Sequence, residues 1–217
     1  MILIQTDDGS HTMKHACGDH YHSLHGSIQE SQHIYIDHGV QAYINKHQGI
    51  QSLRILEVGF GTGLNAYLTA RQLLIHVEYI GVEPDPVTDW DQLNYPLCLN
   101  DASSLFSDIH FCEWGKAQLV TDKMVLNKVK SCFEDIQNQL VDVIYYDAFS
   151  PKTMPSCWDY ASLEKAVNCL KDGGLLVTYC CNGMVKRCLK ELGCDIQLLP
   201  GPIGKRHMLQ AFNKQNT

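Results

Sequence analysis

Three glycines at alternate positions form the stretch of this sequence that is best suited to hold a ligand. Gly59, Gly61 and Gly63 follow an apolar run at 53–58 and precede an apolar pattern that is typical of a helix. A strand that ends in glycines and restarts as a helix is typical of a nucleotide-cofactor turn, because bare backbone lets the ligand approach closely. The spacing excludes a dinucleotide fingerprint, because Leu64 stands where that pattern needs its third glycine or a small residue.

Two acidic residues farther along the chain stand at the ends of predicted strands. Glu83, followed by Pro84, comes after the strand-like run 77–82, and a carboxylate there can accept hydrogen bonds from both ribose hydroxyls of a nucleoside. Asp147 ends the buried apolar run 141–146. Ligands of open parallel sheets lie beyond the carboxyl ends of the strands. We therefore expect Glu83, Asp147 and the glycines to share one cleft.

Alternating strand and helix patterns supply the elements that position these residues. Residues 33–36 are predicted as a short strand before a turn at 37–39, and residues 84–122 as helices and an irregular connection. The remaining pattern predicts strands at 124–130, 175–180, 196–199 and 207–212, helices at 132–140, 161–170 and 185–192, and a turn at 171–174. We expect one structural unit, in which residues 1–50 are an extension packed on a core domain of residues 51–217.

The composition is that of a globular domain in a reducing compartment. The chain has 217 residues, of which 45% are hydrophobic and 19% are charged. It contains no apolar run of membrane-spanning length and does not start with a basic and then apolar signal, so we expect a cytoplasmic protein without a membrane partner. The ten cysteines include no C-x-x-C pair, and several lie in apolar runs, which favours reduced, buried thiols.

The charge is unevenly distributed along the chain. The net charge is −7, and residues 1–100 contain four Lys or Arg against eleven Asp or Glu, whereas the remainder contains thirteen of each. Basic residues gather from Lys186 onward. A polyanion would therefore have to meet the C-terminal part of the chain, because the net charge of the whole repels it.

Histidines are concentrated in the first fifty residues, which hold eight of the eleven. A metal site was considered for them, but the segment has no cysteine pair and no helical His-x-x-x-His with a glutamate between, so no metal is predicted. The polar stretch 21–31 is either a solvated surface or the lip of a pocket, and composition does not separate the two.

The pattern E-x-G-x-G-x-G, which begins at Glu57, resembles the first motif of S-adenosylmethionine-dependent methyltransferases with a Rossmann-like sheet. In that family an acidic residue and bare backbone suit a ligand with a positive amino-acid end and no pyrophosphate. The resemblance implies S-adenosylmethionine as the cofactor. It also implies a class I methyltransferase sheet, mostly parallel with an antiparallel last strand, and a small N-terminal β-containing extension. The cofactor-binding residues expected on these grounds are Glu57, Gly59, Phe60, Gly61, Thr62, Gly63, Asn65, Glu83, Pro84 and Asp147.

Four stretches together resemble the MnmC-type tRNA methyltransferases, which methylate the aminomethyl group of the wobble uridine to give 5-methylaminomethyl-2-thiouridine. The resemblance covers roughly residues 20–212 and is closest to the stand-alone, MnmD-like form without a fused flavin-dependent oxidase. The matching residues are Tyr21-His22-Ser23 with Gly26 and Glu30-Ser31; Glu57 to Asn65; Asp147-Ala148-Phe149-Ser150-Pro151 with Pro155 and Trp158; and Gly201-Pro202, Gly204-Lys205-Arg206 and Met208.

This resemblance implies roles for individual residues. Asp147 would orient the acceptor amine by accepting a hydrogen bond, and whether it also takes the proton of the amine stays open at this level. The implied partners are tRNA and a separate flavin-dependent oxidase or aminomethyl-forming enzyme. The chain departs from the family ending at His207, where glutamate is usual. Rossmann-like methyltransferases also often carry an acid after the third strand that meets the adenine. Ser131 and Cys132 stand near that place here, and Glu134 and Asp135 are the candidates for the contact. The substrate-binding residues implied are Tyr21, Ser23, Glu30, Phe149, Lys186, Arg187, Lys205 and Arg206.

Two alternatives stay open at this level. One is a small-molecule N- or O-methyltransferase. Turnover of a free amine together with weak binding to bulk tRNA would favour it. The other is a non-catalytic relative that binds RNA or a partner. Failure to bind S-adenosylmethionine would favour it.

Overall fold

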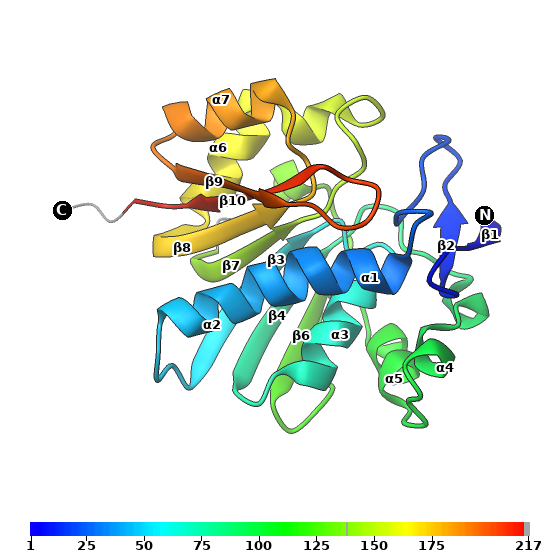
Figure 1. Cartoon of the computed structure of the whole chain (residues 1–217). Helices are drawn as coiled ribbons and strands as arrows, with labels where there is room; N and C mark the ends of the chain where they lie inside the picture. Colours follow the sequence, from blue (N-terminus) through cyan, green and yellow to red (C-terminus); the bar gives the residue numbers. More distant parts are fainter. Residues whose placement is uncertain (138, 215–217) are drawn as a thin grey trace.

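The computed structural model describes residues 1–137 and 139–214, and an eight-stranded sheet lies at its centre (Figure 1). The strand order is β5-β6-β4-β3-β7-β8-β10-β9. Neighbours from β6 to β8 run parallel, whereas β10 is antiparallel to β8 and β9, and β5 is antiparallel to β6. The strands are β3 Ser52–Val58, β4 His76–Val82, β5 Ala117–Leu119, β6 Met124–Val129, β7 Val141–Tyr146, β8 Leu170–Thr178, β9 Asp195–Pro200 and β10 His207–Phe212. The predicted Rossmann-like sheet is confirmed.

Helices cover both faces of this sheet, which explains why its central strands are apolar throughout. All six residues of β7 are buried, as expected for a parallel strand with helices on both sides. Figure 1 shows α6 (Tyr160–Asn168) and α7 (Gly183–Glu191) above the sheet and α3 (Leu64–Gln72) on the opposite side. Two hydrophobic clusters, one on each side, form the core.

A long helical segment replaces the strand predicted at 33–36 and the turn predicted at 37–39. It consists of α1 (Ser27–Ser31), the π-helix η1 (Gln32–Gln41) and α2 (Ala42–Lys46), drawn in blue in Figure 1. Its buried positions recur mostly every three or four residues and pack mainly on β7, β8 and α3; they are Ser27, Glu30, Ser31, Ile34, Tyr35, Ile36, Gly39, Val40 and Tyr43. The strand prediction was wrong because the short run Ile34-Tyr35-Ile36 has β-forming residues that serve here as one face of a helix.

Two further local predictions were wrong. In the predicted helix 132–140 only η3 (Phe133–Asp135) is helical among the described residues, and Asn138 lies outside them. The predicted turn 171–174 is part of β8, because Gly173 and Gly174 exchange backbone hydrogen bonds with Asn213. The predicted strands at 77–82, 124–130, 175–180, 196–199 and 207–212 and the helices at 161–170 and 185–192 are confirmed within one or two residues at most ends. Residues 215–217 of the expected core domain lie outside the described residues.

The remaining elements surround the carboxyl edge of the sheet. The N-terminal extension contains a two-stranded antiparallel sheet, β1 (Ile2–Gln5) with β2 (His11–Lys14). The connection between β4 and β6 carries η2 (Trp90–Gln92), α4 (Tyr95–Cys98), α5 (Leu105–Phe111) and β5, and η4 (Pro155–Trp158) follows β7. Strand β3 lies between β4 and β7, so the chain order reverses there. Such a reversal is where open α/β sheets form their ligand site.

Candidate active site

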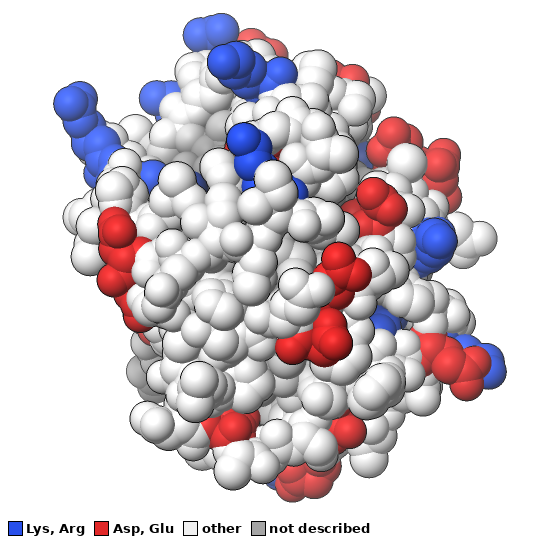
Figure 2. Space-filling view, turned by 90° about the vertical axis from the view of Figure 1, so that its right-hand side faces the viewer, with Lys and Arg blue, Asp and Glu red and all other residues white. Residues whose placement is uncertain are grey.

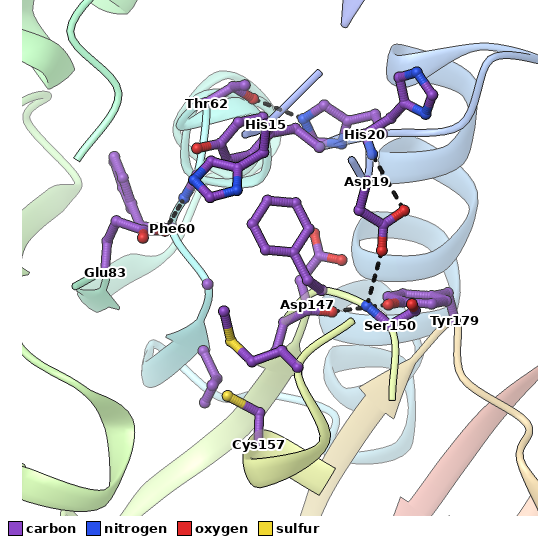
Figure 3. Close-up of a pocket in the computed structure, with 18 of the residues that line it drawn as sticks. His15, Asp19, His20, Phe60, Thr62, Glu83, Asp147, Ser150, Cys157 and Tyr179 are labelled. Atoms are coloured by element: carbon purple, nitrogen blue, oxygen red, sulfur yellow. Dashed lines mark hydrogen bonds between the residues drawn. The ribbon is translucent and has the colours of Figure 1, made fainter. Parts of the chain in front are cut away.

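A cavity of about 520 Å³ lies at this reversal point. Its walls come from the ends of β3, β4, β7 and β8, from the segment after β6, from the loop before β10 and from residues 15–24. In the view of Figure 3, Glu83 and Tyr179 lie on opposite sides of the cavity and Asp147 lies between them. The three strand ends that the sequence analysis expected to share a cleft therefore meet in one cavity.

The glycine loop between β3 and α3 is held in a conformation that disfavours side chains. Gly59 and Gly61 have φ angles of 90° and 49°. A Cβ on Gly59 would lie 2.6 Å from the carbonyl oxygen of Asp147, and one on Gly61 would lie 2.9 Å from the ring of Tyr21. The loop thus packs against the Asp147 strand end on one side and against the N-terminal segment on the other.

Glu83 presents a nearly buried carboxylate to the cavity at the end of β4. Its Oε2 accepts a hydrogen bond from the backbone N–H of Gly61 at 2.9 Å, and its Oε1 accepts one from that of Asp85 at 3.1 Å. Burial raises the pKa of Glu83, whereas these two hydrogen bonds oppose that rise. Each oxygen keeps a further lone pair for a ligand.

Asp147 stands directly after β7 and is held by two side chains that the strand pattern did not point to. Its Oδ1 accepts a hydrogen bond from the hydroxyl of Tyr35 at 2.6 Å, and its Oδ2 accepts one from the Nδ2 of Asn65 at 2.8 Å. Burial raises the pKa of Asp147 to about 7, although both hydrogen bonds lower it. A carboxylate with these properties is able to exchange a proton near neutral pH.

Glu57 does not line the cavity, although the family motif implied a direct contact with the cofactor. It is fully buried and accepts hydrogen bonds from Asn65 Nδ2 and from the hydroxyl of Tyr79, both at 2.8 Å. Asn65 thus uses its amide hydrogens on Glu57 and Asp147. Among the described residues its buried Oδ1 has no hydrogen-bond partner. Because a buried acceptor without a donor is costly, this oxygen fits a ligand that brings an amino group.

The N-terminal segment, residues 15–25, bridges the two sides of the cavity. Asp19 Oδ2 accepts a hydrogen bond from the backbone N–H of Ser150 at 3.3 Å (Figure 3). It accepts another from the hydroxyl of Thr153 at 3.0 Å. On the other side, His15 lies 3.4 Å from Asp85. Nothing in the local pattern marks Asp19, because its partners are more than 130 positions away.

Aromatic rings of this segment gather at the cavity. The ring of Phe149 lies 5.1 Å from those of both Tyr21 and His15, centroid to centroid. The buried His22 makes a 2.6 Å hydrogen bond with Thr62 of the glycine loop, and burial lowers the pKa of His22 to about 4, so its imidazole is neutral. The polar stretch 21–31 is therefore part of a cavity wall.

Glu30 and Lys205 join the N-terminal segment to the loop before β10. The Lys205 ammonium forms an ion pair with Glu30 Oε1, and Glu30 Oε2 accepts a hydrogen bond from the backbone N–H of Ser23 at 2.7 Å. The Lys205 Nζ also lies 4.1 Å from the ring centroid of Tyr179. The hydroxyl of Tyr179 donates to the carbonyl of Ala148 at 2.8 Å.

The structure gathers some of the sequence-predicted residues and separates others. Of the expected substrate-binding residues, Tyr21, Ser23, Glu30, Phe149 and Lys205 line the cavity. Lys186 and Arg187 instead line a separate groove on α7 with Lys190, and Arg206 is exposed. Of the adenine candidates, Glu134 lines the cavity and Asp135 does not; Gly63 is also outside the lining.

The cavity is acidic. Lys205 is its basic residue, whereas the acidic lining residues are Asp19, Glu30, Glu83, Asp85, Glu134 and Asp147. Such walls favour a cationic ligand, and the unpartnered Asn65 oxygen and the Glu83 carboxylate suit an amino group and ribose hydroxyls. Within residues 1–137 and 139–214, no group of three or more His, Cys, Asp or Glu side chains is placed to hold a metal ion. No helix in the described residues is long and apolar enough to cross a membrane.

Comparison with known proteins gives a consistent result. The model of a family described as S-adenosyl-L-methionine-dependent methyltransferase matches residues 104–214. A Paracidovorax citrulli protein, the tRNA 5-methylaminomethyl-2-thiouridine biosynthesis bifunctional protein MnmC, is 28% identical over 212 residues, which cover 89% of this chain and 32% of that protein. The protein of the same name from Burkholderia multivorans is 29% identical over 227 residues, with 94% of this chain and 33% of that protein covered. The chain thus spans about a third of the length of these curated relatives.

A solved structure extends the similarity to the whole fold. The crystal structure of MnmC2 from Aquifex aeolicus superposes with a TM-score of 0.80 and is 23% identical in sequence. The superposition covers 98% of this chain and 70% of that chain. At this identity the likeness concerns the fold.

Proposed function

This chain belongs to the family of S-adenosyl-L-methionine-dependent methyltransferases, and we propose that it methylates the aminomethyl nitrogen of the wobble uridine in tRNA to give 5-methylaminomethyl-2-thiouridine. The names of the curated relatives support this substrate. The observation that carries the proposal is Asp147, a half-buried carboxylate that lies beside the glycine loop and faces the same cavity. A carboxylate in that place suits an amine acceptor.

The residues that would hold the cofactor lie along the ends of β3 and β4. S-adenosylmethionine supplies an electrophilic methyl group when it is bound. Glu83 accepts hydrogen bonds from the ribose hydroxyls, and Asn65 Oδ1 accepts one from the amino-acid end. Glu57 acts indirectly, because its hydrogen bond to Asn65 fixes the orientation of that amide. Cys132, Phe133 and Glu134 line the cavity close in sequence to the expected adenine contact near Ser131.

Asp147 prepares the acceptor amine. An ammonium group has no lone pair, so the amine has to lose a proton before it can attack a methyl group. Asp147 accepts a hydrogen bond from the amine and takes that proton. Its hydrogen bonds from Tyr35 and Asn65 fix the direction of the carboxylate. Alignment of two bound reactants supplies most of the remaining acceleration.

The tRNA reaches the cavity with its wobble base turned out of the stack. Tyr21 and Phe149 offer aromatic faces for that base. The phosphate contacts are Lys186, Arg187 and Arg206. Figure 2 shows Lys and Arg side chains toward the top of the face it presents, the level at which Figure 1 places α7. Acidic side chains occupy the middle and lower parts of that face, so phosphates meet the protein at the α7 side.

The proposal includes the setting of the reaction. A separate flavin-dependent oxidase or another aminomethyl-forming enzyme supplies the primary amine. Residues 1–50 act as an extension packed on the methyltransferase domain of residues 51–217. A cytoplasmic location follows from the tRNA substrate and agrees with the free, buried thiols of Cys112, Cys180, Cys188 and Cys194.

The test is methyl transfer to tRNA from cells that lack this methylation, with labelled S-adenosylmethionine and nucleoside analysis of the product. Label is expected in 5-methylaminomethyl-2-thiouridine with the parent protein and not with Asp147→Asn. A parallel reaction with a free primary amine is the control. Label in the free amine alone would make the chain a small-molecule methyltransferase, and absence of cofactor binding would make it a non-catalytic relative.

A further inference from the structure

Asn65 lies in the first turn of α3, where a single buried amide contacts two acidic residues. The residue is 2% exposed. Its Nδ2 donates hydrogen bonds to Glu57 Oε1 and to Asp147 Oδ2, both at 2.8 Å. Glu57 belongs to β3, which leads into the glycine loop, whereas Asp147 directly follows β7. The amide therefore joins the strand that carries the glycine loop to the residue that faces the acceptor amine.

The two acids decide how this amide is oriented. A reversed amide would place its oxygen against the acceptor oxygens of both acids, which an ionised carboxylate cannot satisfy because it has no donor. The other oxygens of the acids are occupied as well. Glu57 Oε2 accepts from the hydroxyl of Tyr79 at 2.8 Å, and Asp147 Oδ1 accepts from that of Tyr35 at 2.6 Å. The Asn65 oxygen is thereby directed away from both acids.

The Asn65 oxygen is the part of this network that a ligand completes. Asn65 lines the cavity, yet its buried Oδ1 meets no hydrogen-bond donor in the part of the chain that the structure describes. A buried acceptor without a donor costs free energy, so the site favours a ligand that brings one. The proposed function places the amino-acid end of the cofactor here, and its amino group supplies that donor.

We propose that Asn65 couples the two halves of the site: when its oxygen accepts a hydrogen bond from the cofactor, its N–H groups hold Asp147 more firmly for the acceptor amine. The inference rests on the proposed function, because it takes Asp147 as the residue that receives this amine. A hydrogen bond accepted by an amide oxygen polarises the amide and strengthens the bonds that its N–H groups donate. By linkage the acceptor also tightens cofactor binding. Asn65 is thus a positioning residue that acts through Asp147.

The first experiment compares two ligands that differ in the amino-acid end. S-adenosylhomocysteine carries it, whereas 5′-methylthioadenosine has the adenosine and the sulfur without it. In calorimetric titrations Asn65→Ala should weaken binding of S-adenosylhomocysteine by about tenfold and leave that of 5′-methylthioadenosine nearly unchanged. Glu83→Gln should weaken both, because both carry the ribose. Equal losses for the two ligands in Asn65→Ala would overturn the inference.

The second experiment measures the coupling itself. The Kd for tRNA from cells that lack this methylation is determined without ligand, with saturating S-adenosylhomocysteine and with saturating 5′-methylthioadenosine. S-adenosylhomocysteine should lower this Kd by about fivefold in the parent protein, and neither ligand should lower it in Asn65→Ala. Thr69→Val is the matched control. Thr69 is also a buried polar residue of α3, and its hydroxyl donates to the backbone carbonyl of Asn65 at 2.7 Å, but it does not line the cavity. This variant should keep the parent coupling.

A spectroscopic measurement without tRNA separates this inference from the proposed function. The ¹³C carboxyl resonance of Asp147, assigned by its absence in Asp147→Asn, should shift when S-adenosylhomocysteine binds the parent protein and much less in Asn65→Ala. That difference supports the inference even if no methyl reaches tRNA. An equal shift in both proteins, or an equal coupling factor for tRNA, would overturn it even if tRNA is methylated. If Asn65→Ala does not fold, Asn65→Ser, which has a donor but no amide to join the two acids, takes its place.

Discussion

Asp147 combines a half-buried carboxylate with two hydrogen-bond donors, Tyr35 and Asn65, so its proposed role in proton transfer can be tested at a single residue. Asp147→Asn keeps the shape but loses the charge and the ability to take a proton. We expect kcat to fall by about 100-fold or more, with cofactor and tRNA affinity changed much less. Because burial raises the pKa of Asp147 to about 7, the parent kcat should rise with pH through that value, as the carboxylate loses its proton. The measurement is kcat against pH at saturating substrates.

The control at this scale is Glu83, whose side chain is buried and which we propose holds the ribose. Glu83→Gln should mainly raise the cofactor concentration needed for half-maximal rate. If Asp147→Asn instead kept full turnover and lost only cofactor affinity, Asp147 would be a binding residue and the catalytic assignment would be wrong.

Single residues differ in how far the sequence reveals them. Glu83 and Asp147 were predictable because each follows an apolar strand, and strand ends of a parallel sheet converge. Asp19 and Tyr35 were not, because their partners are distant in sequence and neither belongs to a recognisable motif. Tyr35 would have been found if the spacing from Ser27 to Tyr43 had been taken as helical.

At the scale of elements, the glycine loop between β3 and α3 is the connection that we propose binds the cofactor. Gly61→Ala should weaken binding of S-adenosylmethionine by tenfold or more, because its Cβ would meet the Tyr21 ring and the loop would no longer direct the Gly61 N–H at Glu83. Calorimetric titration measures this affinity.

The chain offers a matched control for that variant. Gly49 also has a positive φ, of 86°, but a Cβ there would meet nothing within 4 Å. Both alanine variants should lose roughly 1 kcal/mol of unfolding free energy, yet Gly49→Ala should keep full cofactor affinity. Equal affinity in the two variants would show that the loop is not the cofactor site.

The strands and helices also differ in how well the sequence pattern predicts them. The parallel strands of the sheet were predictable, because buried parallel strands are apolar runs of characteristic length. The short antiparallel β5, which lies in the range 84–122 predicted as helices and an irregular connection, was not predicted, because none of its three residues is buried. The helix over 27–46 was not, since Ile34-Tyr35-Ile36 is equally suited to a strand and only its packing against β7 and β8 selects the helix. In the π-helical stretch Ile36 is buried as well, so the spacing of buried residues departs from the 3.6-residue period by which an α-helix is predicted.

At the scale of the whole molecule, a protein of net charge −7 has to bind a polyanion through a local basic surface. Lys186→Gln with Arg187→Gln should weaken tRNA binding and reduce the slope of log K against log salt by about one for each lost phosphate contact. Binding isotherms at several salt concentrations measure this slope, and cofactor affinity should stay unchanged.

Lys46 and Lys123 form the matched pair for this test, because they precede β3 and β6 at the opposite edge of the sheet. Their replacement by Gln changes the net charge equally and should leave the salt slope at its parent value. If the two double variants behaved alike, the tRNA would respond to overall charge and α7 would not be its contact surface.

The contact between Glu30 and Lys205 joins positions 175 residues apart, and this separation affects how the protein is made. During synthesis the glycine loop and the helix over 27–46 leave the ribosome long before the loop that carries Lys205. Contacts of such high sequence separation form late, because a long stretch of chain has to be ordered first. A nascent chain therefore contains the glycine loop before it contains Lys205, so the cavity wall that the Glu30–Lys205 pair joins is completed only after residue 205 has been synthesised.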